Sequence, residues 1–293
     1  MPMFVLAHLS DPHLAPLPLP RPRELLSKRG LGYLNWLRKR RRIHRAEMLA
    51  AAVADLKDHA PDHIAVTGDL VNLSLTNEFA PALAWLGALG DPHDVTFVPG
   101  NHDSYVGAAE KFAEQQWGAF MRGDLGESFP FVRRRGSLTL IGLSTSLPTP
   151  PLAATGCLHG DQIAGLDQLL AKLKREQAFR VILIHHPPVE GANYFRRLTN
   201  AGALRDVLRR HGAELVLHGH HHKASLNWLP GPQIRVPVIG VPSASGAPER
   251  HDEPAGYNLY EIEGAWGAWR CTMISRGWRG GGFTEVDRQP LFA

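Results

Sequence analysis

The sequence predicts one α/β domain with an insertion near its N-terminal end, and three observations predict it. Short apolar runs of strand type alternate with longer segments whose apolar residues recur at helical spacing. The chain has 293 residues, 44% of them hydrophobic, which is enough to bury one large core. A Pro-rich, basic stretch interrupts the alternation at residues 15–43. We therefore expect a domain over residues 1–285, an insertion or cap at 15–43 and a tail at 286–293.

In the first third of the chain, residues 4–9 form an apolar run that predicts a buried strand. Four prolines in residues 15–22 exclude a regular helix or a central strand there. Residues 23–43 are basic and contain Gly30 and Gly32, which predicts two short helices in place of one. Apolar residues at helical spacing then predict a helix over residues 44–59, ending before Pro61.

The same two patterns predict the elements of the middle of the chain, from residue 63 to residue 217. The expected helices there cover residues 76–90, with Thr76 as N-cap, 107–122, 160–176 and 200–211. The expected strands cover residues 63–67, 95–98, 138–143, 181–184 and 214–217.

The helical pattern fades in the last quarter of the chain. Four strands are expected there, at residues 224–229, 234–241, 257–263 and 268–275, pairing antiparallel. The Gly-rich stretch after residue 276 is expected to be poorly ordered.

The composition of the chain indicates the cellular compartment in which the protein functions. No apolar stretch reaches the roughly 18 residues that a membrane span needs, and no basic leader precedes the first strand. The two cysteines, Cys157 and Cys271, suit a reduced compartment and are expected to be buried or half-buried apolar residues. These features predict a cytoplasmic protein, with peripheral attachment to a membrane as the alternative.

The positive charge is concentrated in one stretch. Residues 21–45 hold ten Lys or Arg residues and only Glu24 as an acid, so this stretch carries a net charge of +9. The whole chain carries +4, so the rest of the chain carries −5. A local basic patch implies an anionic partner at that place.

Five polar clusters are the most informative feature of the sequence, because each follows a strand-type apolar run. They are Asp11-Pro12-His13, Gly68-Asp69, Gly100-Asn101-His102-Asp103, His185-His186-Pro187 and Gly219-His220-His221-His222. Ligands bind at the carboxyl ends of strands in open α/β sheets, so these clusters are expected to meet at one rim. Their carboxylate, amide and imidazole groups are sufficient to bind two metal ions.

In this order, the clusters resemble the motifs of the calcineurin-like metallophosphoesterases: D-x-H, G-D, G-N-H-D, a strand-terminal His and G-H-x-H. The resemblance spans about residues 4–245. It is greatest to the bacterial subgroup with His-His-Pro-Pro at the fourth motif, which includes cyclic-nucleotide and glycerophosphodiester phosphodiesterases. It implies a four-layer α/β/β/α sandwich of two mixed sheets flanked by helices, with a dinuclear metal centre.

The resemblance also implies the ligands. One ion would take Asp11, His13 and His222, the other would take Asn101, His185 and His220, and Asp69 would bridge them. Imidazole ligands favour Mn, Fe, Zn or Co over Mg or Ca, and the sequence does not choose among the four. A hydroxide held between the ions would attack phosphorus in line with the leaving oxygen.

The third motif supplies the expected catalytic residues. By the resemblance, His102 lies close to the metals without binding them, so it would stabilise the phosphoryl oxygens or protonate the leaving group. Asp103 would orient His102.

Several neighbouring residues are weaker candidates for contact with the substrate. His186 and His221 adjoin ligands, and each has packing as the alternative role; Asn72 could bond the site or cap a turn. His218 is expected to be a buried histidine with satisfied hydrogen bonds. The loop after His185 mixes aromatic and basic residues that could stack a base and pair a phosphate. Its candidates, together with one from the basic stretch, are Tyr194, Arg196, Arg197 and Arg41.

Three interpretations of the basic insertion remain open. It could be a solvated flap, an anion clamp over a nucleotide or phosphate-rich substrate, or an amphipathic element that docks on anionic lipid through residues 21–45. Arg suits phosphate because its guanidinium binds two oxygens at once.

Phosphodiester or pyrophosphate hydrolysis of a small nucleotide, such as a cyclic nucleotide, is the leading function. A membrane-associated hydrolase of a nucleotide-linked lipid pyrophosphate, of the UDP-diacylglucosamine type, is the alternative. A non-catalytic scaffold should have lost ligands, and this chain has all of them. A nuclease would need a longer basic groove, so nucleic acid is not the expected partner.

Overall fold

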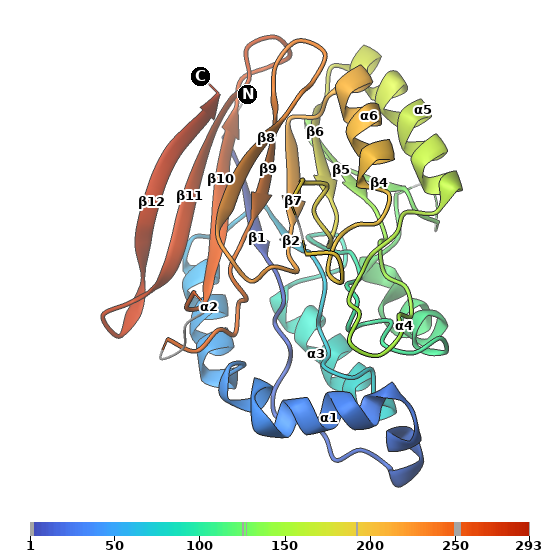
Figure 1. Cartoon of the computed structure of the whole chain (residues 1–293). Coiled ribbons are helices and arrows are strands. Elements are labelled where there is room, and N and C mark those ends of the chain that lie inside the picture. The colour runs from blue at the N-terminus through green and yellow to red at the C-terminus, as the bar shows by residue number, and fades with distance from the viewer. Residues whose placement is uncertain (1–2, 125, 127, 192, 249–252, 293) are drawn as a thin grey trace.

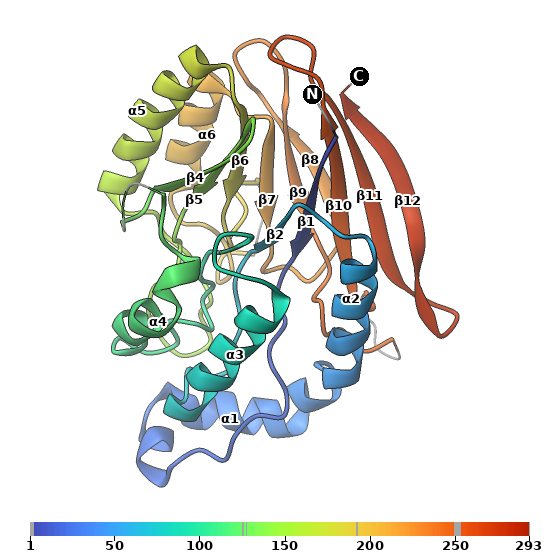
Figure 2. The same ribbon diagram turned by 180° about the vertical axis from the view of Figure 1, so that it is seen from behind.

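Two six-stranded sheets pack face to face in the computed structural model, which describes residues 3–124, 126, 128–191, 193–248 and 253–292 (Figures 1 and 2). The first sheet has the order β12-β11-β10-β1-β2-β3 and the second β4-β5-β6-β7-β9-β8. The strands of the first sheet are β1 (Phe4–Leu9), β2 (His63–Val66), β3 (Val95–Phe97), β10 (Gly256–Glu263), β11 (Arg270–Arg279) and β12 (Gly282–Phe292). Those of the second are β4 (Phe131–Arg135), β5 (Leu138–Gly142), β6 (Phe179–Leu183), β7 (Leu215–His218), β8 (Ser225–Leu229) and β9 (Val236–Gly240).

Helices cover the outer faces of both sheets, with α5 and α6 on the second sheet and α2 and α3 on the first (Figures 1 and 2). The α-helices are α1 (Lys28–Arg38), α2 (Ala46–Asp58), α3 (Phe79–Leu89), α4 (Ala109–Trp117), α5 (Gly160–Glu176) and α6 (Ala201–His211). Short 3-10 turns are η1 (Pro22–Leu26), η2 (Arg40–Arg42), η3 (Thr76–Glu78) and η4 (Gly118–Phe120). The predicted four-layer sandwich is confirmed.

Side-chain alternation along the strands builds the layers. In β6, Val181 and Leu183 belong to the core shared with the first sheet, whereas Ile182 and the following Ile184 pack in a second core beneath α5 and α6. Successive strand residues point to opposite faces, so a continuous apolar run is buried on both sides. This is why the strands read as uninterrupted apolar runs in the sequence.

Strand direction positions the polar clusters. β1, β2 and β3 are parallel, and so are β5, β6, β7 and β9. Their carboxyl ends therefore meet at one edge of the sandwich. The insertion lies across this edge, with α1 below the ends of both sheets in Figure 1.

The structure corrects three expectations about secondary structure. Gly30 and Gly32 do not divide residues 23–43 into two helices; both lie inside the single helix α1. A Cβ at position 32 would lie 2.6 Å from the Tyr105 hydroxyl, so the glycine permits close packing of α1. Strand β4 was not predicted. Strand β9 pairs parallel with β7, although the last strands were expected to be antiparallel.

The C-terminal end is ordered, and the expected tail at 286–293 was wrong for the residues that the structure describes there. Residues 282–292 form β12, which pairs with β11 in an antiparallel hairpin. Gly280 and Gly281 connect the strands with φ of 60° and 94°, a combination that fits a tight hairpin turn. Both cysteines are as predicted, with Cys157 half-buried and Cys271 buried.

No helix in the described part of the chain combines the length and the hydropathy needed to cross a bilayer.

One half-buried ion pair ties α2 to the C-terminal hairpin. Arg276 on β11 donates from Nε and Nη2 to the Asp55 carboxylate at 2.7 and 2.6 Å, and the Tyr257 hydroxyl donates to it at 2.6 Å. Burial alone would raise the pKa of Asp55, but these donors outweigh it and lower the pKa below 3.8. A carboxyl with a depressed pKa contributes stability above its unfolded pKa and loses it as the pH falls through the folded value.

We therefore predict that Asp55→Asn lowers the free energy of unfolding by about 2 kcal/mol at pH 7. Urea denaturation should show this loss. The difference from wild type should begin to shrink as the pH falls below 3.8 and should close once the pH is below the lowered pKa of folded Asp55, where the wild-type carboxyl is also neutral. Asp58→Asn, an exposed change in the same helix, serves as control and should cost almost nothing. A difference that is independent of pH would contradict the account.

Candidate metal centre

The five polar clusters meet where the parallel strands end. Asp11 and His13 follow β1, Asp69 follows β2, and Asn101 follows β3. The second sheet contributes His185 after β6, and His220 and His222 after β7. All of these side chains are buried except that of His222, which is half-buried. Residues separated by up to about two hundred positions thus form one polar centre between the two sheets.

The backbone at this centre is held in an unusual conformation. Five of the seven predicted ligands have positive φ: 52° at Asp11, 39° at His13, 57° at Asp69, 70° at His220 and 54° at His222. Side chains of L-residues disfavour this region by about 1 kcal/mol or more per residue. Backbone bonds hold it in place, such as the one from the His13 amide to the Asp69 carbonyl at 3.0 Å. Strain of this kind is typical of functional sites.

Close packing fixes the glycine of the second motif. Gly68 has a φ of 99°, and a Cβ there would overlap Nδ1 of His185 and the backbone of Gly100. The glycine lets the loop with Asp69 approach the second sheet closely.

The first group of donors surrounds a single point. Nε2 of His222 lies 3.4 Å from Nε2 of His13 and 3.0 Å from a carboxylate oxygen of Asp11. His13 also lies 3.7 Å from the Asp69 carboxylate. Nδ1 of His13 lies 3.2 Å from the Val71 carbonyl, so Nδ1 holds the proton and the lone pair of Nε2 faces the group. These four residues could bind one metal ion.

The second group of donors meets Asp69 through His185. Nδ1 of His185 donates to the Thr67 carbonyl at 2.6 Å, which directs Nε2 at the Asp69 carboxylate, 3.4 Å away. The side-chain oxygen of Asn101 and Nε2 of His185 are buried without a hydrogen-bond partner. Such atoms are rare in proteins unless a ligand or an ion meets them. Nε2 of His220 lies 2.8 Å from the Arg196 carbonyl, so Nδ1 is the atom with a lone pair for an ion.

Charge supports the same assignment. Asp69 is buried, which would raise the pKa of its carboxyl, but the imidazoles of His185 and His102 outweigh burial and lower it. Burial would lower the pKa of His185, but the Asp69 carboxylate raises it to about 9. The centre is therefore built around a buried negative charge that needs cations beside it. The residues present fit a pair of divalent transition metals.

Asp103 has a different role from the one predicted. Its carboxylate accepts from the amides of Asp69, Leu70 and Gly100 at 2.8, 2.9 and 2.8 Å, and from that of Val71 at 3.3 Å. Burial and the Asp69 charge raise the pKa of Asp103, and the amide donors oppose that rise. The expectation that Asp103 orients His102 is wrong; it fixes the loops that position Asp69 and Asn101.

Asn72 orients His102 in place of Asp103. The Asn72 carbonyl accepts from Nδ1 of His102 at 2.5 Å, so Nε2 faces the cavity. The Asn72 side chain donates to the Leu14 carbonyl at 2.9 Å and does not enter the site. Burial and the charge of Arg40 lower the pKa of His102 to about 3.

Two residues at the centre were missed by the sequence analysis. Arg40, from η2, places its guanidinium against His13 and His102. The predicted Arg41 is exposed and does not line the cavity. His44 is buried with its ring centroid 4.3 Å from that of His13, and Nδ1 lies 2.9 Å from the Ser245 hydroxyl. No local signal distinguished Arg40 from its basic neighbours.

The remaining candidates for contact with the substrate differ in whether they line the cavity. Both ring nitrogens of buried His186 have partners, Nδ1 the Thr145 hydroxyl at 2.7 Å and Nε2 the Ala154 carbonyl at 3.1 Å. One of its ring nitrogens also lies within 4.8 Å of ring nitrogens of His185 and His220. Arg196 lines the cavity and donates to the His220 carbonyl at 2.9 Å.

The other candidates lie outside the cavity lining. Tyr194 and Arg197 are exposed and contact each other, with the guanidinium 4.5 Å from the ring centroid. His221 is half-buried and packs beside His220. His218 is buried, as expected, and its Nδ1 bonds the Gly219 carbonyl. Its Nε2 has no hydrogen-bond partner, so only one of the two ring nitrogens is satisfied.

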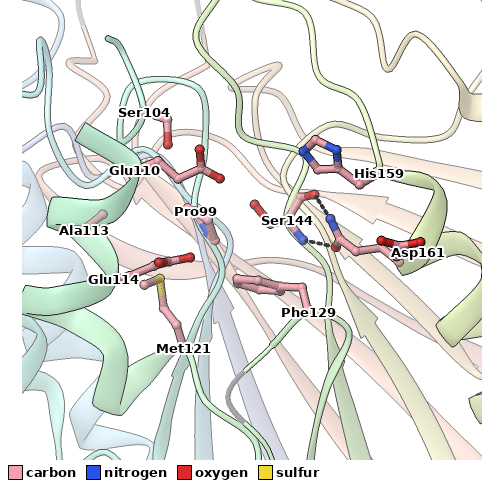
Figure 3. A pocket seen from close by; sticks show the side chains of 11 residues that line it. Pro99, Ser104, Glu110, Ala113, Glu114, Met121, Phe129, Ser144, His159 and Asp161 are labelled. Atoms are coloured by element: carbon pink, nitrogen blue, oxygen red, sulfur yellow. Dashed lines mark hydrogen bonds between the residues drawn. The ribbon is translucent and has the colours of Figure 1, made fainter. Parts of the chain in front are cut away.

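A cavity of about 290 Å³ opens over the centre, between the insertion and the second sheet. It is lined by Asn35, Lys39, Arg40, Ile43, His44, Asp69, Asn101, His102, Ala154, Arg196, His220 and His222. A second cavity, of about 230 Å³, lies between α4 and α5 (Figure 3). Glu110, Glu114 and Asp161 contribute acidic groups to it, and none of the predicted ligands lines it. The first cavity is therefore the one that serves the centre.

Comparison with known proteins agrees with this geometry. A family model described as calcineurin-like phosphoesterase matches residues 4–224, which is more than half of the chain. The chain therefore belongs to the calcineurin-like phosphoesterases, and it is a metal-dependent phosphoester hydrolase.

Individual relatives are distant. A probable cyclic nucleotide phosphodiesterase from Synechococcus sp. is 27% identical over 228 residues, which cover 76% of this chain and 80% of the relative. A dimetal phosphatase from Danio rerio has a TM-score of 0.67 at 15% identity over 99% of both chains. A purple acid phosphatase from yellow lupin seeds has a TM-score of 0.62 at 14% identity, covering 98% of this chain and 53% of that one. These two solved structures share the fold.

The contacts of Asp103 generate a prediction about metal binding. Asp103→Asn places an amide NH2 among backbone N–H donors, which should distort the loops of Asp69 and Asn101. We expect Mn affinity to fall about 10- to 100-fold, as for other residues that hold metal ligands in position. Equilibrium dialysis with metal analysis measures this. Asp91→Asn, at an exposed site, is the matched control, and equal Mn affinity in the two variants would refute the role of Asp103.

Proposed function

We propose that the chain is a phosphodiesterase with a dinuclear metal centre that acts on a small nucleotide, such as a cyclic nucleotide. The observation that carries the proposal is the pair of donor groups on either side of Asp69, with Nε2 of His185 and the Asn101 oxygen buried and unpartnered. The name of the Synechococcus relative supports the substrate class.

The proposed ligand sets are Asp11, His13 and His222 for one ion and Asn101, His185 and His220 for the other, with Asp69 between them. Divalent Mn, Fe, Zn or Co bound there would make water nucleophilic at neutral pH and would neutralise phosphate charge. The protein's own part is to hold the donors. Each of His13, His185 and His220 bonds a backbone carbonyl through one ring nitrogen and so presents the other.

His102 is proposed to contact the phosphoryl group. Because Nδ1 donates to Asn72, Nε2 is the atom that reaches the cavity. With a proton on Nε2 as well, the ring would donate to a phosphoryl or leaving-group oxygen. An anionic substrate beside the ring favours that protonated form and offsets the low pKa that burial and Arg40 impose.

Hydrolysis assays test the proposal. With Mn added, the protein should cleave bis-p-nitrophenyl phosphate and at least one cyclic nucleotide faster than p-nitrophenyl phosphate. His102→Ala should lower kcat by about 10²- to 10⁴-fold at unchanged metal content. His93→Ala, at an exposed histidine, should leave kcat unchanged. Protein loaded with metal that cleaves no diester, or that prefers the monoester, would rule out the phosphodiesterase assignment.

A second candidate property is peripheral attachment to an anionic membrane, which would suit a substrate with a nucleotide linked to a lipid. The insertion exposes apolar side chains, with Leu19 and Leu26 84% and 89% exposed and Leu31 56% exposed, next to Arg21 and Arg23. Exposed leucines flanked by Arg are typical of interfacial segments.

Vesicle flotation tests this property. The protein should float with phosphatidylglycerol vesicles and not with phosphatidylcholine vesicles, and Leu26→Glu with Leu31→Glu should abolish flotation by removing the apolar contact. Ile234→Glu, an exposed site in the loop between β8 and β9, is the control. Flotation that the double substitution leaves unchanged would remove the membrane candidate.

A further inference from the structure

The insertion is anchored against the loops of the metal centre. Tyr33 and Trp36 of α1 pack on a small apolar cluster of Leu17, Leu73 and Leu75. The loop that holds Leu73 and Leu75 directly follows Asp69 and Asn72 in the chain. A helix packed in this way presents its side chains at fixed positions.

Polar contacts reinforce the anchoring. Arg29 donates from Nε to the Leu73 carbonyl at 3.0 Å, and also to that of Ser74. Lys28 donates to the Thr149 carbonyl at 2.8 Å, and its ammonium lies 4.2 Å from the centroid of the Tyr105 ring. Two cations of the basic stretch thus attach α1 to the domain, which argues against a free, solvated flap.

Arg40 is the cation that reaches the centre. Its Nη1 lies 2.7 Å from Nε2 and 3.2 Å from Nδ1 of His102, and its Nη2 lies 2.9 and 3.0 Å from the same atoms of His13. The in-plane hydrogen-bonding directions of the two ring nitrogens diverge, so a single guanidinium nitrogen close to both lies over the ring face. The guanidinium therefore stacks on the two rings and leaves its N–H groups able to bind a ligand in the cavity.

Arg40 has no ion-pair partner among the described residues, although the nearby carboxylates of Asp69 and Asp11 favour its charged form. No described carboxylate lies within ion-pair distance of it, and its neighbours are the neutral or cationic rings of His13 and His102. A half-buried charge without a partner is costly. Arg41 and Arg42, in the same turn, are exposed to solvent and escape that cost. A site that keeps an unpaired guanidinium beside its reacting groups is built to receive an anion.

We propose that Arg40 is the phosphate-binding arginine of this site, supplied by the insertion to bind two non-bridging oxygens of the substrate's phosphoryl group next to His102. The proposal rests on the proposed function in taking a phosphoester as the ligand. It gives the basic insertion the role of an anion clamp. Lys39 and Arg196 line the same cavity and extend its positive charge outward. A guanidinium fork matches two phosphate oxygens, which a lysine ammonium cannot do.

The test is phosphate binding to the full chain loaded with Mn, measured by calorimetry for the wild type, Arg40→Ala, Arg40→Lys and Arg42→Ala. Inorganic phosphate should bind Arg40→Ala about 10- to 100-fold more weakly than wild type, because two charge-assisted hydrogen bonds are lost. Arg40→Lys should recover part of the affinity. Arg42→Ala removes the same charge from the same turn and should stay within about twofold of wild type. Metal content is measured in every sample.

Each outcome decides. Equal phosphate affinity in the wild type and Arg40→Ala, at equal metal content, overturns the assignment of Arg40. An equal loss of phosphate affinity in Arg42→Ala also overturns it, because that result would show only a general effect of charge. A loss of metal in both Arg40 variants overturns it too, because Arg40 would then support the metal ligands. If the wild type binds phosphate and cleaves diesters, only the role of Arg40 has failed. If it does neither, the proposed function fails as well.

Discussion

Two carboxylates, Asp11 and Asp69, are buried where the sheets meet, and much of the structure around them follows from that constraint. Neither has a Lys or Arg ion-pair partner among the described residues; imidazoles surround both. A buried carboxylate is tolerated only when hydrogen bonds or cations compensate for its lost hydration. Four backbone amides hold Asp103 behind Asp69, and Nδ1 of His13 and of His185 each bonds a backbone carbonyl, so that Nε2 of both rings faces the carboxylates. The fold thus creates a place for cations by strand direction and loop geometry.

The positions of the candidate ligands could be predicted because the signal is local. A strand ends, a polar residue follows within two or three positions, and parallel strands end on the same edge. Asp11, Asp69 and His185 all obey this rule. The role of Asp103 could not be predicted, because it depends on amides of another loop more than thirty residues away in the chain. The same holds for Arg40: in the sequence it is one of five consecutive Lys or Arg residues, and only the anchoring of α1 selects it.

Other differences had a signal that the prediction did not use. The hairpin of β11 and β12 turns at Gly280-Gly281, and a Gly-Gly pair between two runs of residues such as Trp278 and Phe283 favours a tight turn. The composition of that stretch suggested disorder, but β12 pairs with β11, which is tied to α2 by the bond between Arg276 and Asp55. His44 is a different case. It reaches the centre through a bridge between its backbone and that of Gly246, a contact across about two hundred residues that no local pattern indicates.

The central claim is that the chain binds two transition-metal ions, one on each side of Asp69. Anomalous diffraction from crystals grown with Mn and recorded on both sides of the Mn absorption edge tests it most directly. The account predicts two peaks, one within bonding distance of Asp11, His13 and His222, and one within bonding distance of Asn101, His185 and His220, with Asp69 bound to both. A single peak, or peaks away from these residues while the protein carries Mn, would contradict it.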